Sequence, residues 1–148
     1  MEVVYAYESP KGVHSQSVFL AGPSPREESH PNWRPAALEI LENLDFNGAV
    51  FVPLPRDGVW SLDYGEQVEW ELAHLREAGR IVFWIPRDLE TLPGFTTNVE
   101  FGMYVSSGKA VLGFPDGAPK MQYLEYLAHR MGVFVFHTLE ETLRFAVG

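Results

Sequence analysis

Short apolar runs recur along the whole chain and alternate with longer segments in which apolar residues return every three or four positions. The runs are typical of buried β-strands, and the longer segments are typical of helices with one buried face. The predicted strands are Val3–Tyr7, Ser17–Ala21, Ala49–Pro53, Arg80–Ile85, Ala110–Phe114 and Val133–Phe136. The predicted helices cover about 33–44, 64–78, 98–107 and 120–131, and a last helix follows Thr138, which we expect to cap it together with Glu141.

A strand followed by a helix, repeated to the end of the chain with short connections, predicts a mostly parallel sheet with helices on both faces. We therefore expect an α/β fold, a flavodoxin-like three-layer sandwich, in a single domain spanning residues 1–148. The sheet would contain five parallel strands and an extra N-terminal edge strand. Turn-forming residues at Glu8–Gly12 favour a hairpin between the first two strands, which makes the first strand the edge addition.

The segment Gly94–Gly102 places one acidic residue, Glu100, among small, apolar and neutral residues. We expect Thr96, Thr97 and Asn98 to lie in the loop that enters a helix, and Glu100 to lie in its first turn. Ligands bind beyond the carboxyl ends of the strands in open parallel sheets, so this loop is a candidate site. Taken alone, these residues favour an ordinary first-turn glutamate that is stabilised by the helix dipole.

A second candidate loop follows the strand Ser17–Ala21 and contains Gly22, Pro23, Ser24 and Arg26. A glycine at the end of a buried strand lets a ligand approach the backbone closely. The Ser24 hydroxyl and the Arg26 guanidinium are candidate contacts for an anion, although an exposed loop arginine is an equal alternative. Arg56 and Arg87 also follow strands, which suggests a locally positive mouth at this end of the sheet.

Composition narrows the function classes. The formal net charge of −9 argues against a nucleic-acid polymer as partner, because binding one requires clustered lysine and arginine. The chain has no cysteine, which excludes disulfides, thiolate metal sites and cysteine nucleophiles. The N-terminal residues have no signal-peptide pattern, and no apolar run is long enough to span a membrane. We therefore expect a cytoplasmic protein that binds no membrane.

In this order and spacing, three motifs resemble those of the nucleoside 2-deoxyribosyltransferase-like family. They are Val18–Pro23, the segment Gln67–Glu71 before an apolar strand, and Glu100–Gly102 with Gly108–Val111. The resemblance covers nearly the whole chain, from Val18 to the last helix. It implies a flavodoxin-like fold, a small-molecule nucleoside or nucleotide as partner, no cofactor, and a homo-oligomer whose neighbouring subunits help complete the site. It also makes Glu100 the match of the family's nucleophile.

The chemistry of such a reaction needs two groups. Cleavage of an N-glycosidic bond leaves an electron-poor anomeric carbon, which a carboxylate such as Glu100 can stabilise or bind as a glycosyl ester. The departing base needs a proton, for which Glu71 is the candidate, with Glu69, Asp63 and Tyr64 as alternatives. In related deoxynucleoside monophosphate N-glycosidases the loop that corresponds to Ser24 and Arg26 binds a 5′-phosphate.

The helix at 64–78 presents Gln67, Trp70 and Glu71 on one face. Gln67 and Glu71 are candidates to bind sugar hydroxyls or the edge of the base, while Trp60 or Trp70 stacks on the ring. The alternative is a solvated glutamate pair with Trp70 in the core. His74 follows Glu71 at helical spacing, but two ligands without a third do not make a metal site, and we expect none.

Three positions depart from the pattern of the family's transferases. Arg80 stands where they carry an aspartate at the head of a strand. Gly94, Thr96 and Thr97 occupy the loop in which these transferases tend to carry a second aspartate. The chain ends at Gly148 without the asparagine of these transferases. Hydrolysis, a different nucleoside-like substrate, or a catalytically inactive nucleotide-binding or sensing module on the same fold are therefore alternatives to transfer.

Overall fold

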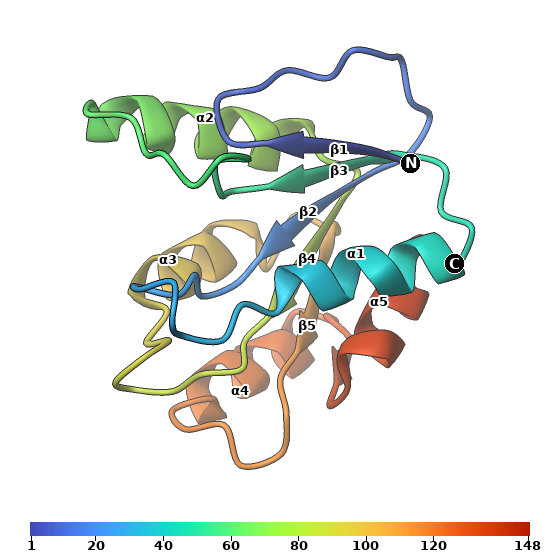
Figure 1. Ribbon diagram of the computed structural model, residues 1–148. Coiled ribbons are helices and arrows are strands. Elements are labelled where there is room, and N and C mark those ends of the chain that lie inside the picture. The colour runs from blue at the N-terminus through green and yellow to red at the C-terminus, as the bar shows by residue number, and fades with distance from the viewer.

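The computed structural model describes residues 1–148 and contains one parallel sheet of six strands in the order β1-β3-β2-β4-β5-β6 (Figure 1). The strands are β1 (Glu2–Tyr5), β2 (Ser17–Ala21), β3 (Ala49–Val52), β4 (Arg80–Trp84), β5 (Ala110–Gly113) and β6 (Val135–Phe136). Strands β2 to β6 have the flavodoxin-like order, and β1 is added at the edge. The predicted fold class is confirmed.

Five helices cover the two faces of the sheet. They are α1 (Arg34–Asn43), α2 (Tyr64–Glu77), α3 (Phe95–Tyr104), α4 (Gln122–Arg130) and α5 (Leu139–Val147). Helices α1 and α5 pack on one face, and α2, α3 and α4 pack on the other (Figure 1). None of the helices combines the length and the apolarity that crossing a membrane requires. Thr138 caps α5 as expected, because its hydroxyl accepts a hydrogen bond from the Glu141 amide.

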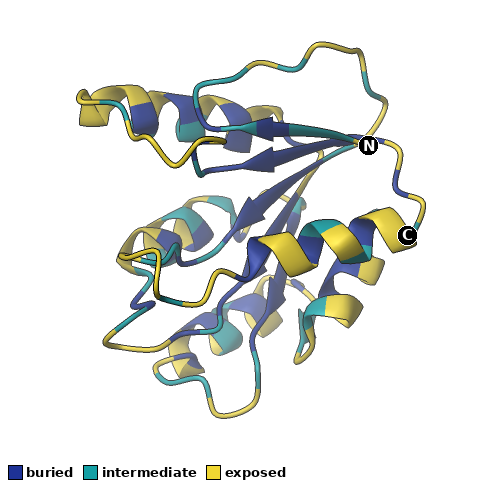
Figure 2. Ribbon diagram, viewed as in Figure 1, coloured by how far each residue is buried: buried dark blue, intermediate teal, exposed yellow.

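The strands are the most deeply buried part of the molecule (Figure 2). Alternate side chains of a strand point to opposite faces, so Phe19 packs toward α2 and α3 while Leu20 packs toward α1. Burial on both faces explains why the strands are continuous apolar runs in the sequence. The sheet is thus fixed from both sides, and the loops at its carboxyl edge project from a rigid base.

The predicted hairpin between the first two strands is wrong. Strand β1 pairs in parallel with β3, from Glu2 opposite Ala49 to Tyr5 opposite Val52. The carboxylate of Glu2 accepts hydrogen bonds from the amides of Lys11 and Gly12. These bonds return the connecting loop to the end of the sheet at which β1 begins, so the next strand runs parallel to β1 rather than antiparallel.

The start of α3 also differs from the prediction. The helix begins at Phe95, after Gly94 in the left-handed conformation (φ 69°, ψ 40°). Glycine adopts this conformation without steric cost, and it turns the chain into the helix three residues earlier than the threonines and the asparagine suggest. Thr96, Thr97 and Asn98 are therefore helical, and Glu100 lies in the second turn. No acidic residue lies in the first turn, so the helix-dipole explanation of Glu100 is wrong.

Candidate functional site

A cavity of about 550 Å³ opens at the carboxyl ends of β2, β3 and β4. The connections leave the sheet in opposite directions at β2 and β4, which is where open parallel sheets form a ligand crevice. Its walls are the loop after β2, the loop before α2, the face of α2 that carries Gln67 and Glu71, and the first turns of α3. The predicted site residues that line it are Gly22, Pro23, Ser24, Arg26, Trp60, Tyr64, Gln67, Glu71, Thr96, Thr97 and Glu100.

Asn98, predicted to bind a ligand together with Thr96 and Thr97, does not line the cavity. Its side-chain oxygen accepts a hydrogen bond from the buried Arg87 instead. Arg87 also donates to the Lys120 carbonyl at 3.0 Å, and Arg56 pairs with Glu8. The three strand-end arginines therefore do not converge, and of these only Arg26 reaches the cavity.

Arg34 is the cavity residue that sequence reasoning missed. It begins α1, and its side chain is buried, with 1% of the residue exposed. The guanidinium donates to the Leu20 carbonyl at 3.1 Å, the Gly22 carbonyl at 2.8 Å and the Ser24 hydroxyl at 3.0 Å. These bonds hold the loop after β2 in place.

A signal for Arg34 was present in the sequence. Arg34, Ala37 and Leu41 are the buried residues of α1, so the arginine occupies a position of the apolar stripe. A charged residue at such a position needs polar partners, which the loop carbonyls supply. The N-cap of α1 is Trp33, and the side-chain oxygen of Asn32 accepts a hydrogen bond from the Arg34 amide at 3.2 Å.

The loop after β2 lies very close to β4. Gly22 has φ 147°, and a Cβ atom built on it would lie 2.1 Å from the Trp84 carbonyl oxygen. The indole of Trp33 donates to the Pro23 carbonyl at 3.1 Å and holds the next residue. Glycine is therefore required here, because any side chain would push the loop out of the cavity wall.

The carboxyl group of Glu100 lies largely buried on α3 and faces the cavity. Burial raises its pKa to about 8; the negative charge of Glu71 also raises it, and the charge of Arg34 opposes the rise. No protein hydrogen bond to the carboxylate offsets these effects. In the free protein at neutral pH, Glu100 is therefore mostly protonated. Perturbed carboxyl groups in clefts of this kind are a mark of functional sites.

Glu71 faces the same cavity from α2. Burial raises the pKa of its carboxyl group, and a hydrogen bond from Gln67 and the charge of Arg34 both lower it. Because the two carboxylates repel one another, ionisation of one raises the pKa of the other. The two proton-release steps are therefore properties of the pair rather than of either residue. Arg34 keeps its charge at neutral pH even though burial lowers its pKa to about 10. The cavity thus combines one buried cation, Arg34, and one exposed cation, Arg26, with two acids whose charges interact.

Gln67 leaves a hydrogen-bond acceptor unused. Its Nε2 donates to Glu71 Oε1 at 2.6 Å and to the Pro53 carbonyl at 3.4 Å. Its Oε1 is buried and has no partner. A buried polar atom without a partner costs free energy, which a ligand N–H or O–H group would recover.

Of the remaining candidate residues, some line the cavity wall and others lie in the hydrophobic core. Trp60 and Tyr64 line the cavity and are 47% and 75% exposed, whereas Trp70 is in the core and donates to the Glu8 carbonyl. Of the two tryptophans predicted to stack on a ligand, only Trp60 lines the cavity. His74 stacks on Trp70, and no three histidine, aspartate or glutamate side chains come together as a metal site.

Two alternatives for the acid lie away from the cavity walls. Asp63 caps α2, where its carboxylate accepts a hydrogen bond from the Gly65 amide at 2.9 Å. Glu69 is exposed and does not line the cavity. Glu71 and Tyr64 are the proton-donor candidates that face it.

A family model described as nucleoside 2-deoxyribosyltransferase like matches residues 15–118 of the chain. This range includes the loop after β2, both cavity carboxylates and the first turns of α3. The chain belongs to the nucleoside 2-deoxyribosyltransferase-like family. No curated protein matches it.

The family member has a carboxylate on α3 that faces the crevice, and the positions at which it departs from the pattern expected of the transferases can now be located. Arg80 is exposed at the start of β4, the end of the strand away from the cavity, and donates to the Gly108 carbonyl at 3.1 Å. Gly94, Thr96 and Thr97 line the cavity directly. One departure from the nucleoside 2-deoxyribosyltransferase pattern, Arg80, therefore lies far from the cavity. The others, at the start of α3, form part of the cavity wall.

Proposed function

We propose that this protein cleaves or transfers the N-glycosidic bond of a nucleoside or nucleotide, with Glu100 as the nucleophile. The main support for this proposal is the position of the Glu100 carboxyl group. It faces the cavity of a nucleoside 2-deoxyribosyltransferase-like protein and has no protein hydrogen-bond partner. Its neighbour Glu71 supplies the acid. The family resemblance extends the proposal to a homo-oligomer.

The proposed reaction has two steps. A Glu100 oxygen attacks the anomeric carbon, the carbon–nitrogen bond breaks, and the departing base takes its electron pair together with a proton from Glu71. A water molecule, or the nitrogen of a second base, then attacks the same carbon and releases the Glu100 carboxylate, while Glu71 accepts the proton of the attacking group. Glu100 holds a proton in the free protein at neutral pH, so this proposal requires that proton to pass to Glu71 before the attack, and it is then the one that the leaving base receives.

The cavity supports a ligand the size of a nucleoside. Its volume of about 550 Å³ lies within the common range for small-molecule sites. The unpartnered Gln67 Oε1 suits an N–H or O–H group, and Trp60 offers an aromatic face for a base. Ser24 and Arg26 line the same wall and could contact a 5′-phosphate.

The test is base release or exchange from 2′-deoxynucleosides, ribonucleosides and their 5′-monophosphates. Glu100→Gln should reduce kcat by about three orders of magnitude or more, because a neutral amide cannot form the glycosyl ester. Glu69→Gln is the matched control, since Glu69 is exposed on the other side of α2 and should leave the rate unchanged. Full activity in the Glu100→Gln variant would overturn the assignment of the nucleophile.

A second candidate is a catalytically inactive nucleotide-binding or sensing module. The observation that favours it is the pKa of Glu100, raised to about 8 by burial and by Glu71, which leaves a neutral acid rather than a nucleophile at pH 7. This alternative expects saturable binding of a nucleotide in calorimetric titrations without base release. It also expects Glu100→Gln to bind as well as the unmodified protein. Base release that depends on Glu100 would exclude it.

A further inference from the structure

Residues 5–8, which connect β1 to the loop that follows it, lie outside the family-matched range 15–118. We infer that this segment, here called the N-terminal brace, positions the loop that carries Trp60 and thereby determines how tightly the cavity binds a nucleobase. The nucleobase as ligand rests on the proposed function, whereas the positioning of the loop by the brace does not depend on it. The loop, residues 55–63, connects β3 to α2 and is here called the Trp60 loop.

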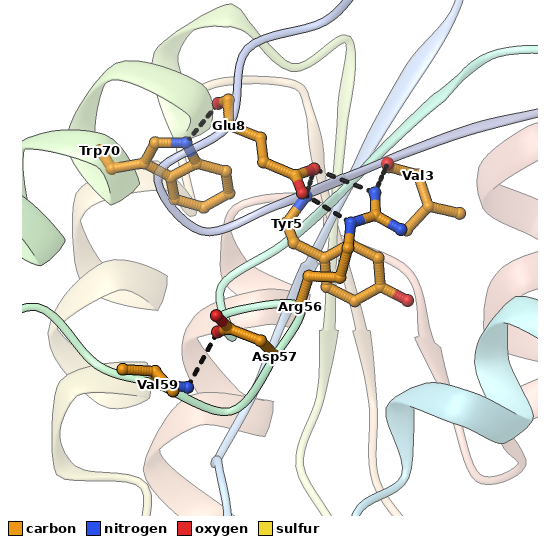
Figure 3. Close-up of polar contacts among 7 residues, drawn as sticks. All are labelled: Val3, Tyr5, Glu8, Arg56, Asp57, Val59 and Trp70. Carbon is orange, nitrogen blue, oxygen red and sulfur yellow. Dashed lines mark hydrogen bonds and ion pairs between the residues drawn. The ribbon is translucent and has the colours of Figure 1, made fainter.

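The first contact of the brace is at the start of the Trp60 loop. The Arg56 guanidinium makes a two-bond ion pair with Glu8, with Nε 2.6 Å from Oε1 and Nη2 3.0 Å from Oε2 (Figure 3). It also lies over the Tyr5 ring, 4.5 Å from its centroid, and donates to the Val3 carbonyl. A two-bond arginine–carboxylate pair restricts direction as well as distance, so it fixes this end of the loop in orientation.

The second contact is next to Trp60 itself. The Ser61 amide donates to the Tyr7 hydroxyl at 3.0 Å, a bond between residues 54 positions apart in the sequence. Tyr7 has φ 72°, a left-handed conformation that is unfavourable for a residue other than glycine. The chain accepts this cost where the ring of Tyr7 reaches across to the Trp60 loop.

The third contact joins the brace to the helix that carries Gln67 and Glu71. The Trp70 indole donates to the Glu8 carbonyl at 2.8 Å, which Figure 3 shows beside the Arg56 pair. Neither Tyr7 nor Glu8 lines the cavity. The brace can therefore affect a ligand only through residues that it holds, which makes its members positioning residues.

Between its anchors the Trp60 loop has little support of its own. Asp57 accepts a hydrogen bond from the Val59 amide, and Gly58 has φ 76°, so the middle of the loop is a local turn. Residues 56–60 are all exposed. Trp60 lies between Arg56 and Ser61, the two points that the brace holds. Without the brace, the position of the indole would depend on the local turn and on the Ser61 hydroxyl, which donates to Glu66 and accepts from the Asp63 amide.

The structural part can be tested without substrate by quenching tryptophan fluorescence with acrylamide. Trp60 is 47% exposed, whereas Trp33, Trp70 and Trp84 are at most 8% exposed, so the quenching reports on Trp60. Tyr7→Phe removes the acceptor for the Ser61 amide, and Glu8→Gln weakens the pair with Arg56. Both should increase the quenching slope toward that of a free indole. Glu140→Gln, which neutralises an exposed arginine–carboxylate pair with Arg144 on α5, is the matched control and should not change it.

The functional part is tested with the nucleosides and nucleotides named above. Trp60→Ala should raise KM, or the Kd in a titration, about 5- to 100-fold through the loss of base stacking. Tyr7→Phe should raise it about 3- to 10-fold with little change in kcat. The effects should not add, so the double variant should resemble Trp60→Ala.

The support of the loop by the brace and its effect on ligand binding are contradicted by different results. Unchanged quenching in both Tyr7→Phe and Glu8→Gln would overturn the brace, and additive effects of Tyr7→Phe and Trp60→Ala on KM or Kd would overturn its action through Trp60. Increased quenching in a protein that neither binds nor cleaves any of the probes would support the brace and contradict the proposed function instead. The two failures are therefore distinguishable.

Discussion

Three side chains from three helices carry the charges in the buried part of the cavity: Arg34, Glu71 and Glu100. Arg26 also lines the cavity but is exposed. Arg34 forms no close ion pair, because its donors are used by two carbonyls and a hydroxyl group. Its charge therefore acts on both acids at once. One cation can balance one ionised carboxylate, so the second acid keeps its proton at neutral pH. This division suits a reaction that needs a nucleophile and a proton donor together.

The pKa of Glu100 has a consequence for stability. It is about 8 in the folded protein against an ordinary value of 4.5, so the folded state holds a proton that the unfolded chain has released between these pH values. Stability is therefore highest below pH 4.5 with respect to this group, and it falls as the pH rises through 8. Glu100→Gln should stabilise the protein by about 1–3 kcal/mol at pH 9 and by almost nothing at pH 4.5.

Thermal unfolding of the Glu100→Gln and Glu69→Gln variants across this pH range measures the effect. Glu69 is exposed, and its replacement should shift the Tm equally little at every pH. A gain from Glu100→Gln that does not grow with pH would contradict the burial of its charge.

The coupling between the acids predicts a second shift. The charge of Glu71 raises the pKa of Glu100, so Glu71→Gln should lower the titration midpoint of Glu100 from about 8. Carbon-13 NMR of labelled glutamate side chains follows this directly, without any turnover. If base release depends on an ionised Glu100, kcat/KM in the unmodified protein rises with pH up to about 8 and then levels off. An unchanged midpoint in Glu71→Gln would show that the two groups do not interact.

At the scale of elements, the strands and their order could be predicted because burial on both faces leaves a strong apolar signal in the sequence. The place of β1 could not, since strand pairing depends on contacts such as Glu2 to Lys11 and Gly12 that no local pattern encodes. The start of α3 was missed for a related reason. The threonines before Glu100 favour turns, but Gly94 and the burial of Thr97 extend the helix through them.

The sequence predicted the residues that form the walls of the site but not the buried arginine beneath them. Ser24, Arg26, Gln67 and Glu71 follow or face the carboxyl ends of strands, and topology alone brings such positions together. Arg34 lies beneath the loop after β2. Its position in the apolar stripe of α1 marks it in the sequence as buried, but only the structure shows that it binds the carbonyls of that loop.

The approach of the β2 loop to β4 predicts a strong effect of a single methyl group. Gly22→Ala would place its Cβ about 2.1 Å from the Trp84 carbonyl oxygen, so the loop must move or the protein must unfold. We expect a loss of at least about 3 kcal/mol in denaturant unfolding. Gly102→Ala is the control, because its Cβ meets open space on α3, and it should be neutral or stabilising by up to about 1 kcal/mol. Equal stability of the two variants would refute the close approach.

At the scale of the whole molecule, charge is the dominant property. The chain has 20 acidic residues against 11 lysines and arginines, and only two close arginine–carboxylate pairs form. The unpaired acids repel one another across the surface, and salt screens this repulsion. At pH 8, raising NaCl from about 10 to 200 mM should therefore increase the Tm by about 2–4 °C, or roughly 1 kcal/mol.

Near the isoelectric point of about 4.9 the net charge vanishes, and the same addition of salt should leave the Tm almost unchanged. Differential scanning calorimetry at the two pH values makes the comparison. A decrease of Tm with salt at pH 8 would mean that favourable ion pairs, rather than repulsion, dominate the surface.

Strand β1 forms one outer edge of the sheet. Backbone groups of alternate residues in a strand point to opposite sides. The amides of Glu2 and Ala6 donate toward the β3 side, to the carbonyls of Gly48 and Leu54. The groups of Val3 and Tyr5 therefore point outward, where another chain could add a strand.

The brace and Arg56 occupy three of these four outward groups, all except the Val3 amide. The Tyr5 amide donates to the Glu8 carboxylate, the Tyr5 carbonyl accepts from the Glu8 amide, and the Val3 carbonyl accepts from Arg56. An incoming strand would have to break these bonds before it could pair. The contacts that hold the Trp60 loop thus also close the edge of the sheet against aggregation by strand addition.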